Sequence, residues 1–259
     1  MFDLTTWAWG LAAISGIAVV TWLVSIPLKN VSIVDSVWSL YFVAAAVTYA
    51  VTTPAPGGPR RVVILVLVAV WAVRLSGYIT WRNRGEGEDK RYVAMRHKYG
   101  ADTFPVMSLF RVFLLQGVLA WIVSLPLLAA VDGTPDLGIL DMVGIAVWLV
   151  GFVFEAGGDA QLARFKADPS NRGKVMDTGL WRYTRHPNYF GDFAQWWGFF
   201  LIGLAAGGWR AIPAPIIMSW LLLKVSGVAL LEKNIEQTRP KYADYVARTN
   251  AFFPGPPRP

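Results

Sequence analysis

The chain has 259 residues, of which 55% are hydrophobic and 16% are charged, and it contains no cysteine. Soluble domains carry about a quarter charged residues, so this composition excludes an ordinary soluble domain, and the missing cysteines exclude disulfides, thiol catalysis and cysteine metal sites. The net charge is +7, but no soluble basic face or Arg/Lys-rich repeat accompanies it, so no nucleic-acid partner is expected.

Long segments without charge alternate with charged ones along the chain, as in a membrane protein, because an unpaired charge at mid-membrane costs several kcal/mol. A span needs about 20 mostly apolar residues. Seven segments meet this requirement: 7–28, 33–52, 62–81, 109–131, 137–157, 190–208 and 211–232. The first is interpreted as a retained span and not as a signal peptide. The predicted fold is an all-α, polytopic membrane protein, a seven-transmembrane-helix bundle that forms one domain over residues 1–259.

The distribution of Lys and Arg predicts the orientation. With the N-terminus outside, loops 82–108 and 158–189 and the tail 233–259 lie on one side together with Lys29, and that side holds eighteen Lys and Arg against three on the other. Cytoplasmic loops carry this excess, so the N-terminus is predicted outside and the C-terminus cytoplasmic. The final PGPPRP is expected to be extended and poorly ordered.

Polar residues within the spans are the first functional candidates, because they are costly to place there. Asp35 lies in the second span, and Arg74 and Tyr78 lie in the third at a spacing that puts both on one helix face. Asp35 and Arg74 could pair only to neutralise each other. Alternatively, they could line a cavity and polarise a substrate carbonyl.

Two carboxylates follow at the cytoplasmic end of the fifth span. Glu155 and Asp159 also share one helix face. They could anchor the helix at the membrane surface together with Arg164, or they could accept hydrogen bonds from the hydroxyl or amide groups of a cofactor.

The densest polar cluster lies in loop 158–189. It offers basic and amide groups around a DTG turn: Asn171, Arg172, Lys174, Arg182, Arg185 and His186. Arg and Lys bind phosphate, so the loop suits a dinucleotide, although anionic lipid headgroups attract such residues too. Polar and aromatic residues interleaved with the cations favour a shaped site: Tyr183, Asn188, Tyr189 and Asp192.

The sequence gives little sign of a metal site, of a common nucleotide-binding motif or of a nucleophilic serine. His97 and His186 are the only histidines, and they form no metal-binding pattern, so no metal is expected. A dinucleotide-binding GxGxxG after a strand, a P-loop and a GxSxG motif are absent from the sequence. Near the C-terminus, residues including Glu232 could cap the same pocket, or the stretch could form an amphipathic surface helix.

The run GLWRYTRHPNYFGD, the seven predicted helices and the closing YADYVARTNAFFP together resemble the steroid 5-alpha-reductase superfamily. The likeness is greatest to its bacterial branch, catalogued as domain of unknown function 1295. The resemblance implies a seven-helix bundle in a bacterial cytoplasmic membrane. It also implies NADPH on the cytoplasmic side and a hydrophobic, lipid-like substrate that enters from the bilayer.

The resemblance also assigns residues. Asp159, Asn188 and Asp192 look like polar cofactor contacts, and Arg172 looks like a phosphate ligand. Tyr183 falls in the matching block, and Glu155 stands where some members have Asn. Arg74 and Tyr78 resemble an Arg-x-x-x-Tyr pair, and Asp35 falls near a Gln-Glu pair that faces the substrate carbonyl.

Two departures separate this chain from the steroid enzymes. Trp71 stands where those enzymes place a catalytic Tyr, and Val34-Asp35 replaces the Gln-Glu pair. Because an indole cannot donate a phenolic proton, the steroid mechanism cannot be carried over intact.

The sequence therefore predicts a membrane-embedded, NADPH-dependent reductase of a carbon–carbon double bond in a lipid. Asp35, Arg74 and Tyr78 would be catalytic. The cofactor-binding residues would be Glu155, Asp159, Arg164, Asn171, Arg172, Lys174, Tyr183, Arg185, His186, Asn188, Asp192 and Glu232. Two alternatives stay open: an S-adenosylmethionine-dependent methyltransferase of the isoprenylcysteine type, which shares RHP-x-Y, and a non-catalytic lipid-binding protein. Membrane lipids are expected partners, and the oligomeric state is left open.

Overall fold

The computed structural model describes residues 3–54, 57–133, 136–225 and 242–258. Every regular element among these residues is helical, and no strand forms within them, so the all-α prediction is confirmed. The chain divides into two compact units, unit 1 with Met1–Gly138 and Ile202–Ala211 and unit 2 with Ile139–Leu201 and Ile212–Pro259.

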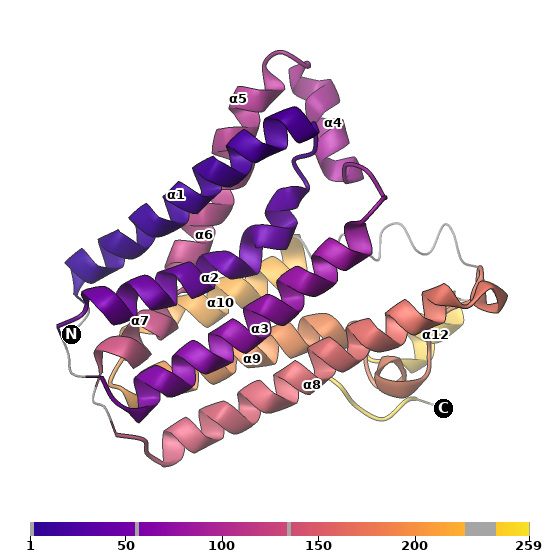
Figure 1. Ribbon diagram of the computed structural model, residues 1–259. Coiled ribbons are helices and arrows are strands. Elements are labelled where there is room, and N and C mark those ends of the chain that lie inside the picture. The colour runs from indigo at the N-terminus through magenta and orange to yellow at the C-terminus, as the bar shows by residue number, and fades with distance from the viewer. Residues whose placement is uncertain (1–2, 55–56, 134–135, 226–241, 259) are drawn as a thin grey trace. The chain divides into compact units, whose positions relative to one another are not determined.

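Unit 1 begins with three long helices: α1 (Leu4–Leu28), α2 (Ile33–Thr52) and α3 (Pro59–Asn83). Helix α2 packs against both α1 and α3 (Figure 1). Asp3 begins α1 by accepting a hydrogen bond from the Thr5 N–H at 2.9 Å, and Lys29 ends it in the left-handed conformation. The observed bounds lie close to the predicted spans.

The rest of unit 1 consists of shorter pieces: α4 (Lys90–Tyr99), α5 (Phe104–Ser108), η1 (Leu109–Leu114), α6 (Leu115–Val123), α7 (Leu125–Asp132) and η4 (Trp209–Ala211). Predicted span 109–131 comprises η1, α6 and α7, with Ser124 between α6 and α7. Pro126 follows this residue, and it has no N–H to continue the hydrogen-bond ladder. The Ser124 hydroxyl donates to the Trp121 carbonyl at 2.7 Å.

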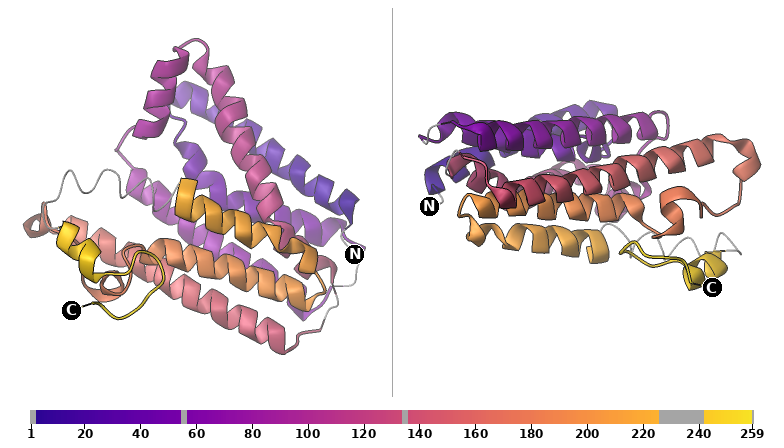
Figure 2. Two further views of the ribbon diagram at one scale, coloured as in Figure 1. Left: turned by 180° about the vertical axis from the view of Figure 1, so that it is seen from behind. Right: turned by 90° about the horizontal axis from the view of Figure 1, so that it is seen from below.

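Unit 2 contains α8 (Ile139–Ala167), η2 (Pro169–Asn171), η3 (Gly179–Arg182), most of α9 (Pro187–Ala205), α10 (Pro213–Trp220), η5 (Leu221–Val225) and α12 (Tyr242–Arg248). Helix α8 continues past the predicted end of the fifth span at 157, so the segment predicted as loop 158–189 begins within a helix. Both views of Figure 2 show α8 and α9 side by side.

Within the described ranges, five helical segments are long and apolar enough to cross a membrane: α1, α2, α3, Phe104–Val123 and α8. Large apolar side chains on these helices are exposed, among them Val62 and Val73 on α3, as expected of surfaces that face lipid. The chain is therefore an integral membrane protein. Predicted span 190–208 corresponds to α9, and 211–232 runs beyond the described residues, so the count of seven and the orientation of the termini stay predictions.

Candidate functional site

Glycines bring the backbones of α8 and α9 into direct contact. A Cβ atom added at Gly151 would lie 2.6 Å from the Gly191 carbonyl oxygen, and one added at Gly191 would lie 2.5 Å from the Gly151 oxygen. About two turns further along α9, a Cβ added at Gly198 would lie 2.8 Å from the Gly144 carbonyl oxygen of α8. Small residues permit such close approach between membrane helices. These four residues form what we call the glycine seam, and it fixes which side chains of α8 face α9.

Two amide side chains of α9 bind two buried carboxylates of α8. The Gln195 Nε2 donates to the Glu155 Oε2 at 2.6 Å, and the Asn188 Nδ2 donates to the Asp159 Oδ1 at 3.0 Å. Asp192, which is also buried, lies one helical turn from Asn188. The structure thus brings four of the predicted cofactor residues together at the seam.

The Arg-His-Pro-Asn-Tyr motif is held by residues 242–258, which we call the C-terminal strap (Figure 2). The Arg185 N–H donates to the Asn250 carbonyl at 2.9 Å, and its Nη1 donates to the Thr249 carbonyl at 2.9 Å. Both carbonyls follow directly on α12. Arg185 therefore binds backbone oxygens through Nη1, and its binding of a cofactor phosphate stays a prediction.

The strap is hydrogen-bonded well beyond α12. The Thr184 Oγ1 donates to the Phe252 carbonyl at 2.7 Å, and the Gly255 N–H donates to the Tyr183 carbonyl at 3.1 Å. The final residues are extended, as predicted, and the Gly255 N–H pairs with the residue two positions before the motif; their poor order stays a prediction. His186, beside these contacts in sequence, is buried.

Exposed cations surround the end of α8. Arg164, Arg172 and Lys174 are exposed, and the Asn171 Nδ2 donates to the Phe165 carbonyl at 3.1 Å, which folds the loop back onto the helix. A surface hollow of about 480 Å³ is lined here by Phe165, Lys166, Ala167, Asp168, Pro169, Asn171, Arg172 and Gly173. The predicted phosphate ligand Arg172 thus lines this hollow together with Lys166, whereas Arg164 and Lys174 are not among its lining residues. Glu232, also predicted for the cofactor, lies outside the described residues.

The predicted catalytic residues lie in unit 1, and Asp35 has partners that the sequence did not reveal. Its Oδ1 accepts from the Tyr92 hydroxyl at 2.7 Å, and its Oδ2 accepts from the Arg91 Nη2 at 2.8 Å. Arg91 also binds Asp89. Asp35 at the start of α2 is therefore joined to α4 by two charge-assisted hydrogen bonds.

Arg74 and Tyr78 share a face of α3, as their spacing predicted. The Arg74 guanidinium carbon lies 5.4 Å from the centre of the Tyr78 ring, and that of Arg82 lies 5.8 Å from it. Cations above an aromatic ring are attracted by its negative face. The Tyr78 ring thus lies close to two guanidinium groups.

Charge on Asp89 contributes to the docking of α4, and this contribution will depend on pH. Burial acts to raise the pKa of Asp89, but hydrogen bonds from the Arg91 side chain and N–H lower it by more, so the pKa lies below its ordinary value. A lowered pKa stabilises the folded protein above about pH 4, and this stabilisation is lost as the pH falls further. Because the side chain is 38% exposed, the effect will be below about 1 kcal/mol.

The matching variant is Asp89→Asn, which removes the charge and keeps an N-cap acceptor for α4. We expect it to lower the thermal midpoint slightly at pH 7 and to match the wild type at pH 3, as measured by thermal unfolding. An equal difference at both pH values would show that the charge of Asp89 is not responsible.

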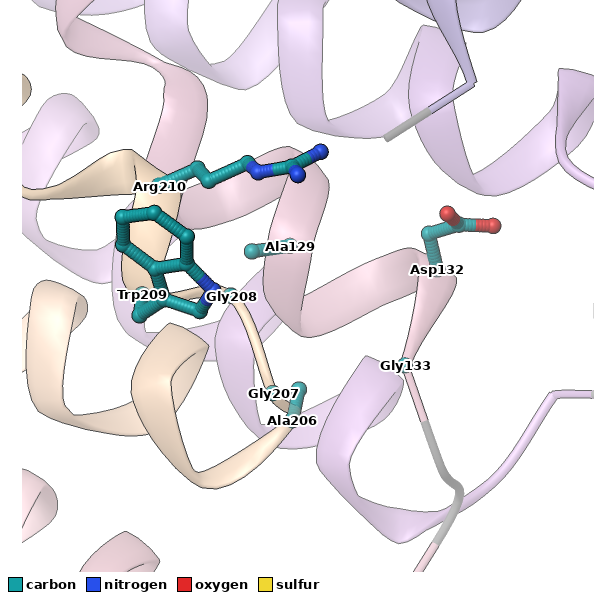
Figure 3. Close-up of a pocket in the computed structure, with 8 residues that line it drawn as sticks. All are labelled: Ala129, Asp132, Gly133, Ala206, Gly207, Gly208, Trp209 and Arg210. Atoms are coloured by element: carbon teal, nitrogen blue, oxygen red, sulfur yellow. The ribbon is translucent and has the colours of Figure 1, made fainter. Parts of the chain in front are cut away.

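Two further hollows belong to unit 1. One of about 640 Å³ lies between the start of α2 and the end of α3, lined by Asn30, Ser32, Ile33, Ser36, Gly77, Thr80, Trp81, Asn83, Arg84 and Gly87. Another, of about 160 Å³, is lined by Ala129, Asp132, Gly133, Ala206, Gly207, Gly208, Trp209 and Arg210. In Figure 3 the side chains of Asp132 and Arg210 lie on either side of Ala129. Neither hollow is lined by a predicted site residue.

Sequence reasoning missed Tyr92, Arg91 and Gln195. Arg91 and Tyr92 lie 56 and 57 positions from Asp35, and local spacing carries no signal over that distance. Gln195 had a signal, because it is an amide within an apolar stretch, seven residues after Asn188. Among the described residues no group of three His, Cys, Asp or Glu side chains is placed to hold a metal ion.

The long apolar helices describe an integral membrane protein. Residues 21–249 match the family described as "Protein of unknown function (DUF1295)", and the chain belongs to this family. An uncharacterized protein of Schizosaccharomyces pombe is 26% identical over 91% of this chain and 76% of its own length.

Similarity to named enzymes is more local. The mouse 3-oxo-5-alpha-steroid 4-dehydrogenase 1 is 33% identical over 67 residues, which are 26% of each chain. The rat enzyme of the same name matches to the same extent, so the chain spans about a quarter of these relatives. The predicted DUF1295 membership is confirmed, and the local matches are consistent with its link to the steroid 5-alpha-reductase superfamily. No solved structure matches the chain.

Proposed function

We propose that the protein is a membrane reductase that uses NADPH to reduce a carbon–carbon double bond in a lipid-like substrate. The observation that carries the proposal is the row of polar side chains between α8 and α9. It consists of the hydrogen-bonded pairs Gln195–Glu155 and Asn188–Asp159, and it continues along α8 to the basic hollow at the end of that helix. The local similarity to 3-oxo-5-alpha-steroid 4-dehydrogenases supports the same reaction class.

The charged side chains of unit 2 fit a phosphorylated dinucleotide. Arg172 and Lys174 are exposed cations of the kind that bind phosphates. Asp159 and Asp192 are carboxylates, which accept hydrogen bonds from ribose hydroxyl groups. From Glu155 to the basic hollow at Lys166, α8 rises by about 16 Å, so acceptors and cations are spread along one elongated path.

One buried acceptor adds to this fit. The Oε1 of Gln195 has no hydrogen-bond partner among the described residues, and the side chain is fully buried. A buried polar atom without a partner is costly and often marks a ligand contact. The amide N–H groups of nicotinamide are donors of the matching kind.

When bound, NADPH supplies a hydride, and the protein supplies positions and charges. We propose that Asp35, with Arg74 or Tyr78, orients or polarises the acceptor group of the lipid. In unit 2, Arg172 and Lys174 would hold the phosphates. The polar side chains between α8 and α9 would hold the rest of the cofactor: Glu155, Asp159, Asn188 and Asp192.

The decisive measurement is the binding of NADPH, NADH and S-adenosylmethionine to the detergent-purified protein and to Arg172→Ala and Asp192→Ala. A hydrogen bond to a charged group contributes about 1.5–3 kcal/mol, so each variant will bind NADPH roughly 10-fold to 100-fold more weakly. Arg258→Ala, an exposed arginine of the strap, is the control and will bind normally.

The other outcomes are equally informative. Tight binding of S-adenosylmethionine without any response to NADPH would replace the reductase by a methyltransferase, since that cofactor carries no phosphates. Binding of neither cofactor would favour a non-catalytic lipid-binding protein.

A further inference from the structure

One face of α3 carries a row of apolar side chains that leads into the hollow of about 640 Å³ in unit 1. Exposed valines follow one another at intervals of three or four residues, which places them on one face of the helix: Val62, Val66, Val70 and Val73. The same interval continues to Gly77 and Trp81, which line the hollow. We call these four valines the valine stripe, and the stripe and the hollow form one continuous surface.

The hollow lies where α3 leaves the apolar zone. A Cβ atom added at Gly77 would meet nothing within 4 Å, so the space beside this glycine is open. Trp81 is 62% exposed, and α3 ends two residues later at Asn83. Tryptophan is enriched at the membrane–water interface. The position of the hollow therefore matches the depth of lipid headgroups.

Hydrogen bonds hold the rim of the hollow in place. The Val31 N–H donates to the Glu88 Oε1 at 2.8 Å, and the Asp89 N–H donates to the Ser32 Oγ at 2.7 Å. Both bonds join the segment after α3 to the start of α2. The two sides of the hollow are thus tied together before any ligand binds.

The polar lining offers donors. The Asn30 Oδ1 accepts from the Ser32 N–H at 2.9 Å, and the Asn83 Oδ1 accepts from the Arg82 Nε at 3.1 Å. Because these two oxygens are engaged, the amide N–H groups are what Asn30 and Asn83 can offer to a ligand. Among the described residues that line the hollow, Arg84 is the charged one and none has a carboxylate. Such a lining suits a phosphate group.

The nearby charges favour a headgroup without a cation. Glu88 and Asp89 follow the hollow in sequence, but they pair with Arg96 and Arg91, at 2.7 and 3.0 Å. The ammonium of a choline headgroup would be repelled by Arg84 and would find these carboxylates already paired. A free phosphate would leave the valine stripe uncovered, whereas a lipid covers it with an acyl chain.

We propose that the hollow is a binding site for an anionic phospholipid. Its phosphate binds Arg84 and the amide N–H groups of Asn30 and Asn83, and an acyl chain lies along the valine stripe. The site belongs entirely to unit 1 and does not depend on the proposed reduction.

The test measures which lipid the detergent-purified protein retains. The protein is mixed with equal amounts of phosphatidylglycerol and phosphatidylcholine of identical chains, and bound lipid is identified by native mass spectrometry. A cation beside an anionic headgroup contributes about 1 kcal/mol, so the wild type will prefer phosphatidylglycerol roughly 5-fold. Arg84→Gln will retain both lipids equally. Lys98→Gln makes the same charge change at an exposed position of α4 and will keep the preference.

A second pair of variants tests the space and not the charge. Gly77→Leu fills the hollow and will lose the retained lipid, whereas Gly16→Leu on α1, where an added Cβ also meets nothing within 4 Å, will keep it. Unchanged retention in Gly77→Leu, or equal loss of preference in Arg84→Gln and Lys98→Gln, would overturn the proposal. Displacement of the lipid by inorganic phosphate would also overturn it, since the hollow would then be a site for free anions.

NADPH titration of the same variants keeps the two proposals apart. Arg84→Gln and Gly77→Leu will bind NADPH as the wild type does, because the residues proposed for the cofactor lie in unit 2. Loss of lipid retention with unchanged NADPH binding is therefore the expected result.

Discussion

Replacing Gly191 by leucine will destabilise the protein and abolish NADPH binding. An added Cβ would collide with the Gly151 carbonyl oxygen and with the backbone of Glu155, and neither backbone group can move without separating α8 from α9. Overpacking of this kind costs about 3 kcal/mol, which corresponds to a fall in Tm of roughly 6–12 °C. Thermal unfolding in detergent and NADPH titration will measure the two effects.

Gly16→Leu provides the matched control, since it makes the same change within a membrane helix. A Cβ at Gly16 on α1 would meet nothing within 4 Å, so the variant will unfold and bind NADPH as the wild type does. If both variants lost the same stability, the cost would come from leucine in any membrane helix and not from the glycine seam.

Arg185→Met will release the C-terminal strap. The variant loses hydrogen bonds from Nη1 to the Thr249 and Val246 carbonyls, at 2.9 and 3.4 Å, and hydrogen bonds to charged groups contribute about 1.5–3 kcal/mol. We expect a loss of about 2 kcal/mol. Limited proteolysis without cofactor will cut faster within 242–258.

The control for this variant is Arg182→Met, which removes an exposed guanidinium three positions earlier and will leave the proteolysis rate unchanged. Since no cofactor is present in the assay, a result for Arg185→Met equal to that of Arg182→Met would contradict the structural role and would leave phosphate binding as the function of Arg185.

Hydropathy predicted the long helices well, because the length of a membrane span is set by the bilayer. The second predicted span, 33–52, has the bounds of α2, and the first and third differ from α1 and α3 by a few residues. Hydropathy did not predict where α8 ends, since a helix can leave the lipid and continue in water. That is why α8 continues to Ala167 although the fifth span was predicted to end at 157.

The candidate site was predictable only where local spacing determined it. The i, i+4 pairs Glu155 and Asp159 on α8 and Arg74 and Tyr78 on α3 share helix faces as expected. The partners of Asp35 were not predictable, because they depend on how the segment after α3 folds back onto α2. Gln195 was overlooked because a single amide in an apolar helix gave no motif.

The strap has a consequence for the order in which unit 2 is built. Gln195 and Glu155 are 40 positions apart, whereas Arg185 and Thr249 are 64 apart, and the partner of Arg185 is synthesised later than either helix of the seam. During translation, the α8–α9 hairpin can therefore assemble while the guanidinium of Arg185 still lacks the strap carbonyls. A nascent chain at this stage would expose its Arg-His-Pro-Asn-Tyr motif, so we expect membrane-insertion factors to meet this intermediate before the strap covers the motif.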